Sequence, residues 1–193
     1  MTTLKDGKGR GFSAGVNSSN RLLTNSITLS EEIAAGQEGL SFAFSSQLVS
    51  FTSATASAIL FLKNTSETDL IVDRARVMLG TVTGGTGDWT LTFLRNPTAG
   101  TIVTNALTAG ITNVNHGSSQ EPVGSFLRGV QGDTLTDGTG ANFPVKSTGD
   151  NQLVFDLFRV LPTGASIGVR LTPPTGTTAA TANVVLRAYY ITQ

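Results

Sequence analysis

The chain has 193 residues and a mass of 20.0 kDa, the size of one domain or of a domain with an arm. Only 13% of the residues are charged, and 13 Lys and Arg balance 13 Asp and Glu. Zero net charge disfavours general electrostatic binding to nucleic acid. The absence of Cys and the single His exclude zinc fingers, iron–sulfur clusters and disulfide frameworks. The longest mainly apolar run, residues 56–62, is far shorter than the ~20 residues that span a membrane.

The first 35 residues differ in composition from the rest. They are rich in Gly, Ser and Asn and cannot bury enough apolar surface to order alone. We predict that residues 1–35 form an extended arm that orders against a partner or against the body, and that residues 36–193 form the body. A floppy tail is the alternative, which aromatic and leucine anchors disfavour. The candidate binding residues of the arm are its basic and large apolar side chains: Leu4, Lys5, Lys8, Arg10, Phe12, Arg21, Leu22 and Leu23.

One motif in the arm has the form of a hydrolase nucleophile elbow. Residues 11–15 read Gly-Phe-Ser-Ala-Gly, with Ser13 at the nucleophile position. That motif requires a buried strand before it and a helix after it. A Gly- and Lys-rich segment precedes it instead, and His116 is the one His available as a base. We interpret the match as a chance one and predict that the chain is not an enzyme.

Beyond the arm, the pattern changes to strands and turns. Ser30 to Ala35, followed by Gly36, predicts one short helical turn with a Ser cap and a Gly stop. The later runs are rich in Val, Ile, Phe, Thr and Tyr, which suit strands. The run 69–79 predicts a strand with a bulge near Arg74, and residues 84–87 predict a hairpin turn. The strands are expected at 40–44, 58–63, 69–79, 89–94, 101–104, 125–130, 152–160, 166–172 and 183–191.

The spacing of these strands predicts the architecture. About nine strands with no helices between them indicate an all-β antiparallel sandwich or barrel. They extend over more sequence than the ~100 residues of an immunoglobulin domain. Two long excursions interrupt them, at 110–125 and 132–150. We therefore predict a jelly-roll-like β-sandwich with an extended N-terminal arm.

Two features of the loops could bind a ligand. His116 could act as a pH switch or a ligand contact, although a hydrogen-bonded loop histidine is the favoured interpretation. Asp133 and Asp137 could help to bind Ca²⁺, but they do not match the D-x-[DN]-x-[DN]-G loop. A turn rich in Asp and Gly explains them better. We predict no metal site and no cofactor.

Several short segments resemble virion structural proteins of tailed bacteriophages. They are Lys5 to Gly9, Asn20 to Leu22, Leu62 to Asn64, Arg95 to Thr101 and Asn113 to Ser119. Among these proteins the format is most similar to capsid decoration or cement proteins. The resemblance implies a β module on the capsid surface of the virion, made in the host cytoplasm and often trimeric. It also implies binding to the major capsid protein or to a neighbouring copy, without direct contact to nucleic acid or membrane.

The arm would supply the contacts in such a role. Its basic residues would meet acidic capsid surface, and its apolar residues would anchor in grooves. A tail, baseplate or fibre component that binds the host surface is the alternative, and it would place function in loops 110–125 and 132–150. An esterase or glycosidase is a third, disfavoured class, because Ser13 is its one motif.

Overall fold

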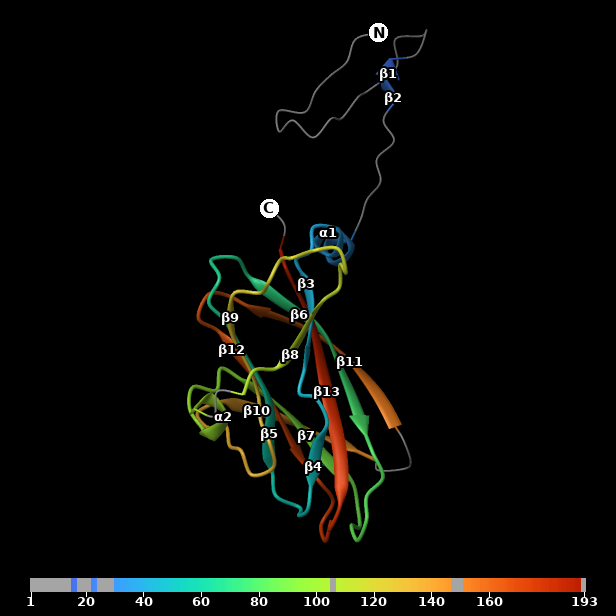
Figure 1. Cartoon of the computed structure of the whole chain (residues 1–193), viewed down its shortest axis with the longest axis vertical. Coiled ribbons are helices and arrows are strands. Elements are labelled where there is room, and N and C mark those ends of the chain that lie inside the picture. The colour runs from blue at the N-terminus through green and yellow to red at the C-terminus, as the bar shows by residue number, and fades with distance from the viewer. Residues whose placement is uncertain (1–14, 17–21, 24–29, 105–106, 147–150, 192–193) are drawn as a thin grey trace. The chain divides into compact units, whose positions relative to one another are not determined.

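The computed structural model of the chain describes residues 15–16, 22–23, 30–104, 107–146 and 151–191. The chain divides into two units, Met1–Ser30 and Glu31–Gln193. In the first unit, β1 (Gly15–Val16) pairs antiparallel with β2 (Leu22–Leu23). The second unit contains both large sheets (Figure 1).

The described part of the second unit contains eleven strands and two short helices. In chain order they are α1 (Glu31–Gln37), β3 (Ser41–Ser45), β4 (Val49–Phe51), β5 (Ser57–Asn64), β6 (Leu70–Leu79), β7 (Trp89–Arg95), α2 (Thr101–Thr104), β8 (Gly110–Asn113), β9 (Gly124–Arg128), β10 (Thr139–Val145), β11 (Asn151–Leu161), β12 (Ser166–Thr172) and β13 (Ala180–Tyr190).

Two antiparallel sheets form the sandwich. The six-stranded sheet has the order β11-β6-β13-β3-β8, with β4 also paired to β13, and the five-stranded sheet has the order β10-β7-β12-β5-β9. Eight of the strands pair in a nested way, β3 with β13, β5 with β12, β6 with β11 and β7 with β10. Nested pairing of this kind is the topology of a jelly roll. The predicted jelly-roll β-sandwich is therefore confirmed.

The segment between β7 and β10 adds strands to one side of the sandwich. Strand β8 extends the six-stranded sheet beside β3, and β9 extends the five-stranded sheet beside β5. On the other side β10 and β11 end the two sheets. The sandwich thus has two different open edges, a β8–β9 edge and a β10–β11 edge.

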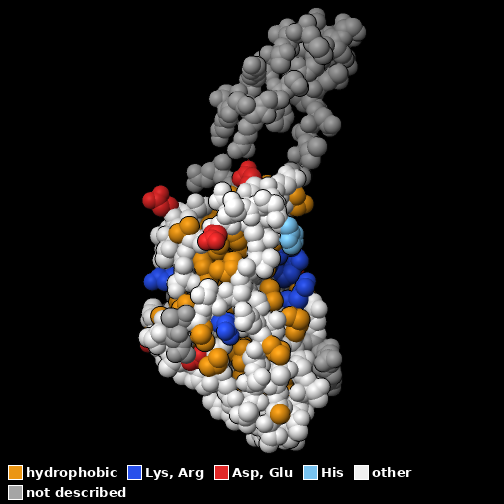
Figure 2. All heavy atoms as spheres, in the orientation of Figure 1, with side chains coloured by type: hydrophobic (Ala, Val, Ile, Leu, Met, Phe, Trp, Pro, Cys, Tyr) orange, Lys and Arg blue, Asp and Glu red, His pale blue; other side chains and the backbone are white. Residues whose placement is uncertain are grey.

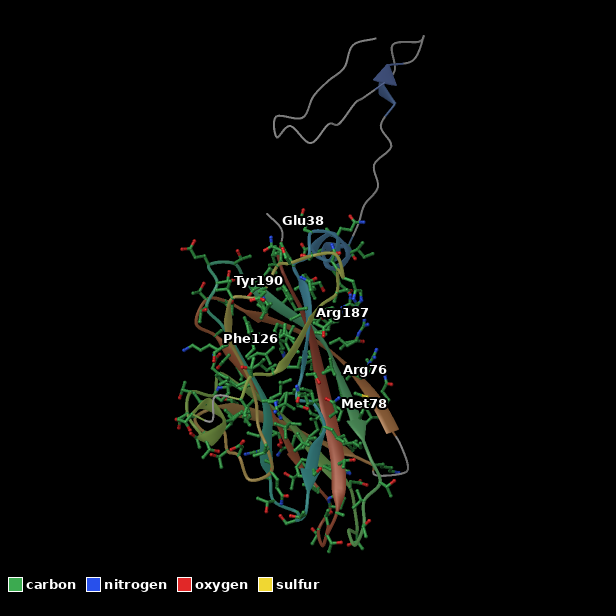
Figure 3. The ribbon with its side chains drawn as sticks, viewed as in Figure 1. Glu38, Arg76, Met78, Phe126, Arg187 and Tyr190 are labelled. Atoms are coloured by element: carbon green, nitrogen blue, oxygen red, sulfur yellow. The ribbon has the colours of Figure 1, made fainter. Side chains whose placement is uncertain are left out.

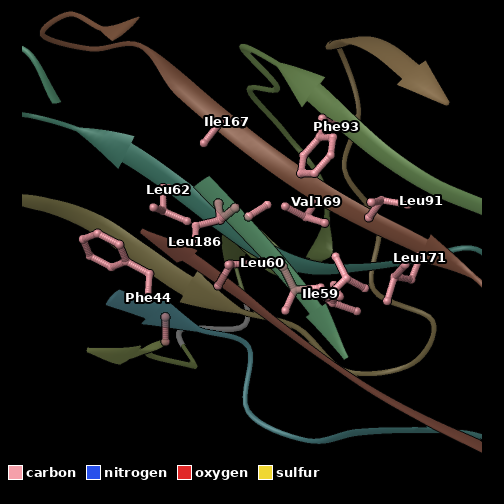
Figure 4. Close-up of a cluster of buried hydrophobic side chains, with 14 of the residues drawn as sticks. Phe44, Ile59, Leu60, Leu62, Leu91, Phe93, Ile167, Val169, Leu171 and Leu186 are labelled. Atoms are coloured by element: carbon pink, nitrogen blue, oxygen red, sulfur yellow. The ribbon is translucent and has the colours of Figure 1, made fainter. Parts of the chain in front are cut away.

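The inner faces of the sheets form a single core. Phe44 and Leu186 of the six-stranded sheet belong to the same buried cluster as Leu60, Leu91 and Val169 of the five-stranded sheet (Figure 4). Leu91 of β7 lies between Thr90 and Thr92, whereas Leu60 lies between Ile59 and Phe61 because β5 is buried on both faces. The largest buried side chain, Trp89, meets Phe51 edge-on at 5.4 Å between ring centroids. A second cluster of Ala58, Phe61, Leu94, Ile102 and Leu135 lies under α2.

The two helices are short and pack locally. Helix α1 buries Ala35 against Ile71 and Tyr189, and it runs through Gly36 rather than stopping there. Helix α2 replaces the predicted strand 101–104, because Ile102 turns into the cluster beneath it and Val103 N–H donates to the Gly100 carbonyl. Across the described ranges, neither helix has the length and apolar character that crossing a bilayer requires.

The other predicted strands lie near their expected places. Three further strands, β4, β8 and β10, were not predicted. Strands β8 and β10 lie inside the predicted excursions, and β10 contains Gly140 and Pro144, which are typical of turns. The bulge near Arg74 is confirmed, since the register of β6 with β13 shifts between Val72 and Arg74. The predicted hairpin at 84–87 is wrong, because β6 and β7 belong to different sheets and this segment crosses between them.

Candidate interaction site at the open β10–β11 edge

Most of the predicted binding residues of the arm lie outside the described residues. Leu22 and Leu23 form β2, and their side chains are not described. The residues that lie outside the described ranges are Leu4, Lys5, Lys8, Arg10, Phe12 and Arg21, together with Ser13 of the elbow motif. A site must therefore be sought in the body.

The β10–β11 edge contains a groove of about 600 Å³. Its walls come from residues 139–143 of β10 and residues 157–161 of β11, and its floor comes from β7 and β12. These walls belong to edge strands, which pair on one side alone among the described strands. An edge strand leaves a row of backbone N–H and C=O groups without partners in the sheet.

Three phenylalanines form an aromatic contact beside this groove, and two of them, Phe93 and Phe143, line it. Phe93 of β7, Phe143 of β10 and Phe155 of β11 form a triangle with ring centroids 5.9–6.0 Å apart. Phe93 is buried, whereas Phe143 is 37% exposed. The triangle links the two sheets at this edge, and it gives the groove an aromatic surface that solvent can reach.

The wall formed by β11 is irregular. Its register with β6 shifts between Asp156 and Arg159, and Phe158 within this bulge has φ 45°. A bulky residue in the left-handed region is strained, and such strain is concentrated at functional sites. The Phe158 side chain is 72% exposed and Val160 is 55% exposed. The bulge thus turns a large aromatic side chain outward at the rim of the groove.

Among the described residues, the charges that line the groove are all positive. They are those of Arg95 and Arg159, and no described Asp or Glu lines it. Arg95 lies on the face of β7 that bears Phe93, and Arg159 pairs in register with the core residue Val72. Both arginines are exposed, and neither has an ion-pair partner among the described residues.

A second charged cluster holds α1 on the six-stranded sheet. Arg187 of β13 forms an ion pair with Glu32 at 2.7 Å, and Figure 3 shows Arg187, Arg76 and Met78 along the outer side of this sheet. Burial raises the pKa of the Asp73 carboxyl; nearby Glu32 raises it further, and Arg187 and Arg74 oppose this. The Asp73–Glu32–Arg187 cluster therefore links helix α1 to strands β6 and β13.

The loop residues singled out from the sequence have structural partners. Asp133 accepts hydrogen bonds from Thr101 Oγ1 and from the Val130 N–H, each at 2.8 Å. Asp137 accepts one from Thr98 Oγ1 at 3.2 Å, so the interpretation as a hydrogen-bonded turn fits both residues. Within the described residues, no group of three or more His, Asp or Glu side chains is placed to bind a metal ion.

Comparisons with known proteins give little similarity. No protein-family model matches the chain, and no curated protein matches it significantly. A chain of the T13 viral particle of IBDV is 12% identical with a TM-score of 0.30; the match covers 78% of this chain and 35% of that one. A chain of T=1 particles derived from infectious bursal virus is 11% identical with a TM-score of 0.17, covering 78% and 40%.

Both of these weak neighbours are chains of virus particles, and this chain spans well under half the length of either. Similarity of this degree assigns neither family nor function. The jelly-roll fold of this chain rests on its own strand pairing.

Proposed function

We propose that the chain is a non-catalytic structural protein of a virion, a decoration or cement protein that binds the shell of major capsid protein and stabilises the head. The observation that carries this proposal is the β10–β11 edge, where Phe143, Phe158 and Val160 are exposed beside an apolar groove. Exposed apolar surface rimmed by polar residues is typical of protein interaction sites. In this role the body contributes a docking surface, and residues 1–35 contribute the predicted arm.

Linking capsid subunits requires many modest contacts. Symmetric copies, as in a homotrimer, multiply a weak contact into a strong one by avidity. An extended arm adds contacts by strand addition and by inserting apolar anchors such as Phe12 into grooves of the shell. Low surface charge suits such close packing, and Figure 2 shows that uncharged side chains and backbone make up most of one face of the body.

The position of the protein on its particle tests this proposal. We would attach a gold label to a C-terminal tag and image purified virus particles that carry the tagged chain. A decoration protein gives label over the whole shell. Label at one vertex alone would support a tail, baseplate or fibre component, and particles without label would refute both roles.

The arm is tested separately by deletion. Removing residues 2–25 is expected to abolish binding to the shell while the β-type circular dichroism remains. The matched control keeps the arm but replaces Lys5, Lys8, Arg10 and Arg21 by Gln, which separates the basic from the apolar contacts. Undiminished binding of the truncated protein would remove the arm from the proposal.

A further inference from the structure

We propose that the groove at the β10–β11 edge binds an extended segment of a partner chain that carries apolar side chains and one carboxylate, and that Arg95 and Arg159 bind this carboxylate. The inference rests on the proposed function, because it states the chemistry of the partner surface that the edge would meet. Three properties of the groove carry it, namely its backbone, its apolar lining and its charge.

The backbone of the groove favours an extended chain segment. Residues Thr139–Phe143 form a regular strand edge. The next residue, Pro144, has no backbone N–H and so cannot donate a hydrogen bond to an added strand. On the other wall, the bulge between Asp156 and Arg159 leaves residues 157–158 out of register with β6, and residues 159–161 pair regularly again. The groove therefore lies where the edge of β10 is still regular, and a segment added there would pair with free backbone groups.

The lining selects alternating apolar side chains. Thr139, Ala141 and Phe143 share one face of β10, and Ala141 lies opposite Phe93 in register. The other wall and the floor add Leu157, Ala165 and Ile167. Because side chains of a strand alternate between its faces, a partner segment would place every second side chain against this lining.

The charge of the groove selects against the arm of this chain. Arg95 and Arg159 project from the inner sides of their sheets at the opening, and no acidic residue is among the described residues of the lining. An arginine guanidinium binds a carboxylate through strong, charge-assisted hydrogen bonds. The arm carries four basic residues up to Thr28 and only Asp6 as an acid, so its arrival would bring like charges together. An acidic segment of another protein fits instead.

Peptide binding to the full-length protein tests the inference without any particle. The probe is a capped nine-residue peptide in which Thr alternates with Val and the sixth residue is Asp, facing the same side as the Val residues. Matched peptides carry Asn or Lys at that position. Binding is followed by amide chemical shifts of the labelled protein. The Asp peptide should shift residues 93–96, 139–143 and 157–167, and should bind at least about tenfold more tightly than the Lys peptide.

Variants of the arginines assign the charge contact. R95A and R159A together should remove the preference for Asp, whereas Arg76→Ala, an exposed arginine on the outer face of β6, should leave it unchanged. All variants are first checked for unchanged thermal unfolding. A loss of preference in R76A as well would overturn the role of the groove.

Further probes separate the other occupants. A peptide of residues 2–25 of this chain tests the arm as occupant, and dodecanoate tests a small anionic lipid. Light scattering tests self-association with a second copy. Tighter binding of any of these than of the Asp peptide would overturn the inference, as would no saturable binding of the Asp peptide. If self-association increases in the arginine variants, the inference is overturned. The two arginines would then be charges that prevent the edge strands from pairing with a second copy. None of these results depends on where the protein lies on a particle.

Discussion

The two open edges of the sandwich are built in opposite ways. At the β8–β9 edge, Phe126 stacks on Phe44 with ring centroids 4.6 Å apart. The Tyr190 hydroxyl accepts a hydrogen bond from the Val123 N–H at 2.9 Å and is 3.1 Å from the Val123 carbonyl, to which it donates. An isolated bridge joins Thr108 to Leu127. Figure 2 shows hydrophobic side chains in a hollow of this face, framed by polar atoms. These contacts hold the two sheets together at this edge, although Ile111 of β8 and Val123 beside β9 remain exposed.

The β10–β11 edge is held together differently among the described residues. One aromatic triangle joins its sheets, and beside it lie the groove, the exposed Phe158 and two arginines without ion-pair partners. The comparison indicates that one edge contributes to stability and the other provides the binding surface. The segment inserted between β7 and β10 stabilises one edge, while the other keeps surface that a partner can cover.

The largest expected effect concerns the aromatic contacts of the two edges. Phe126 is 5% exposed, and Phe126→Ala should lower the free energy of unfolding by about 3–5 kcal/mol. The partly exposed Phe143 of the other edge serves as the control, and Phe143→Ala should cost about 1–2 kcal/mol. Urea unfolding of both variants measures the difference. An equal or larger cost for F143A would mean that the β10–β11 edge is as important to folding as its counterpart.

A smaller effect is expected at the hydrogen bonds of the β8–β9 edge. Tyr190→Phe removes the hydroxyl that bonds both backbone groups of Val123, and it should cost about 1 kcal/mol. Amide exchange at Val123 should become faster, while exchange in β10 stays as it was. Unchanged exchange at Val123 would show that these hydrogen bonds are not needed.

The same tyrosine predicts a dependence on pH. Burial raises the pKa of the Tyr190 phenol, and its hydrogen bond with Val123 opposes this. Above the ordinary tyrosine pKa of about 10, the unfolded chain loses this proton while the folded chain still holds it, so stability falls as pH rises towards the folded pKa. The stability advantage of the native protein over Y190F should therefore shrink from about pH 9 to pH 11. Tyr189, whose pKa burial also raises, remains in both proteins and cancels in the comparison.

The alternation of apolar residues was enough to predict most of the fold. Strand β12 lies at 166–172 as expected, because Ile167, Val169 and Leu171 alternate with residues of the outer face. Strand β10 was missed because Gly140 and Pro144 indicate a turn, although Ala141, Phe143 and Val145 alternate with period two. Tertiary pairing with β7 outweighs these two residues, which an edge strand tolerates.

The site was harder to predict than the fold. The groove needs β10 and β11 at the same edge, and that neighbourhood follows from the nested strand order rather than from any motif. Arg95 and Arg159 are far apart in sequence and give no local signal. Phe158 is part of an apolar run that predicts a buried strand, and the bulge that exposes it depends on pairing with β6. The arm residues named from composition stay a prediction.

The smallest expected effect separates strain from binding at Phe158. Glycine adopts φ 45° without the steric cost that an L-residue incurs, whereas alanine keeps that cost. Phe158→Gly should therefore be about 0.5 kcal/mol more stable than Phe158→Ala in thermal unfolding, because the larger backbone entropy that Gly loses on folding offsets part of the relieved steric cost. Both variants lack the ring, so both should bind the Asp peptide more weakly than the native protein and to the same extent. If F158A is as stable as F158G, the bulge holds no strain. If both variants bind the Asp peptide as well as the native protein does, the exposed ring is not part of the binding surface. The contrast between the edges then rests on the groove and its arginines.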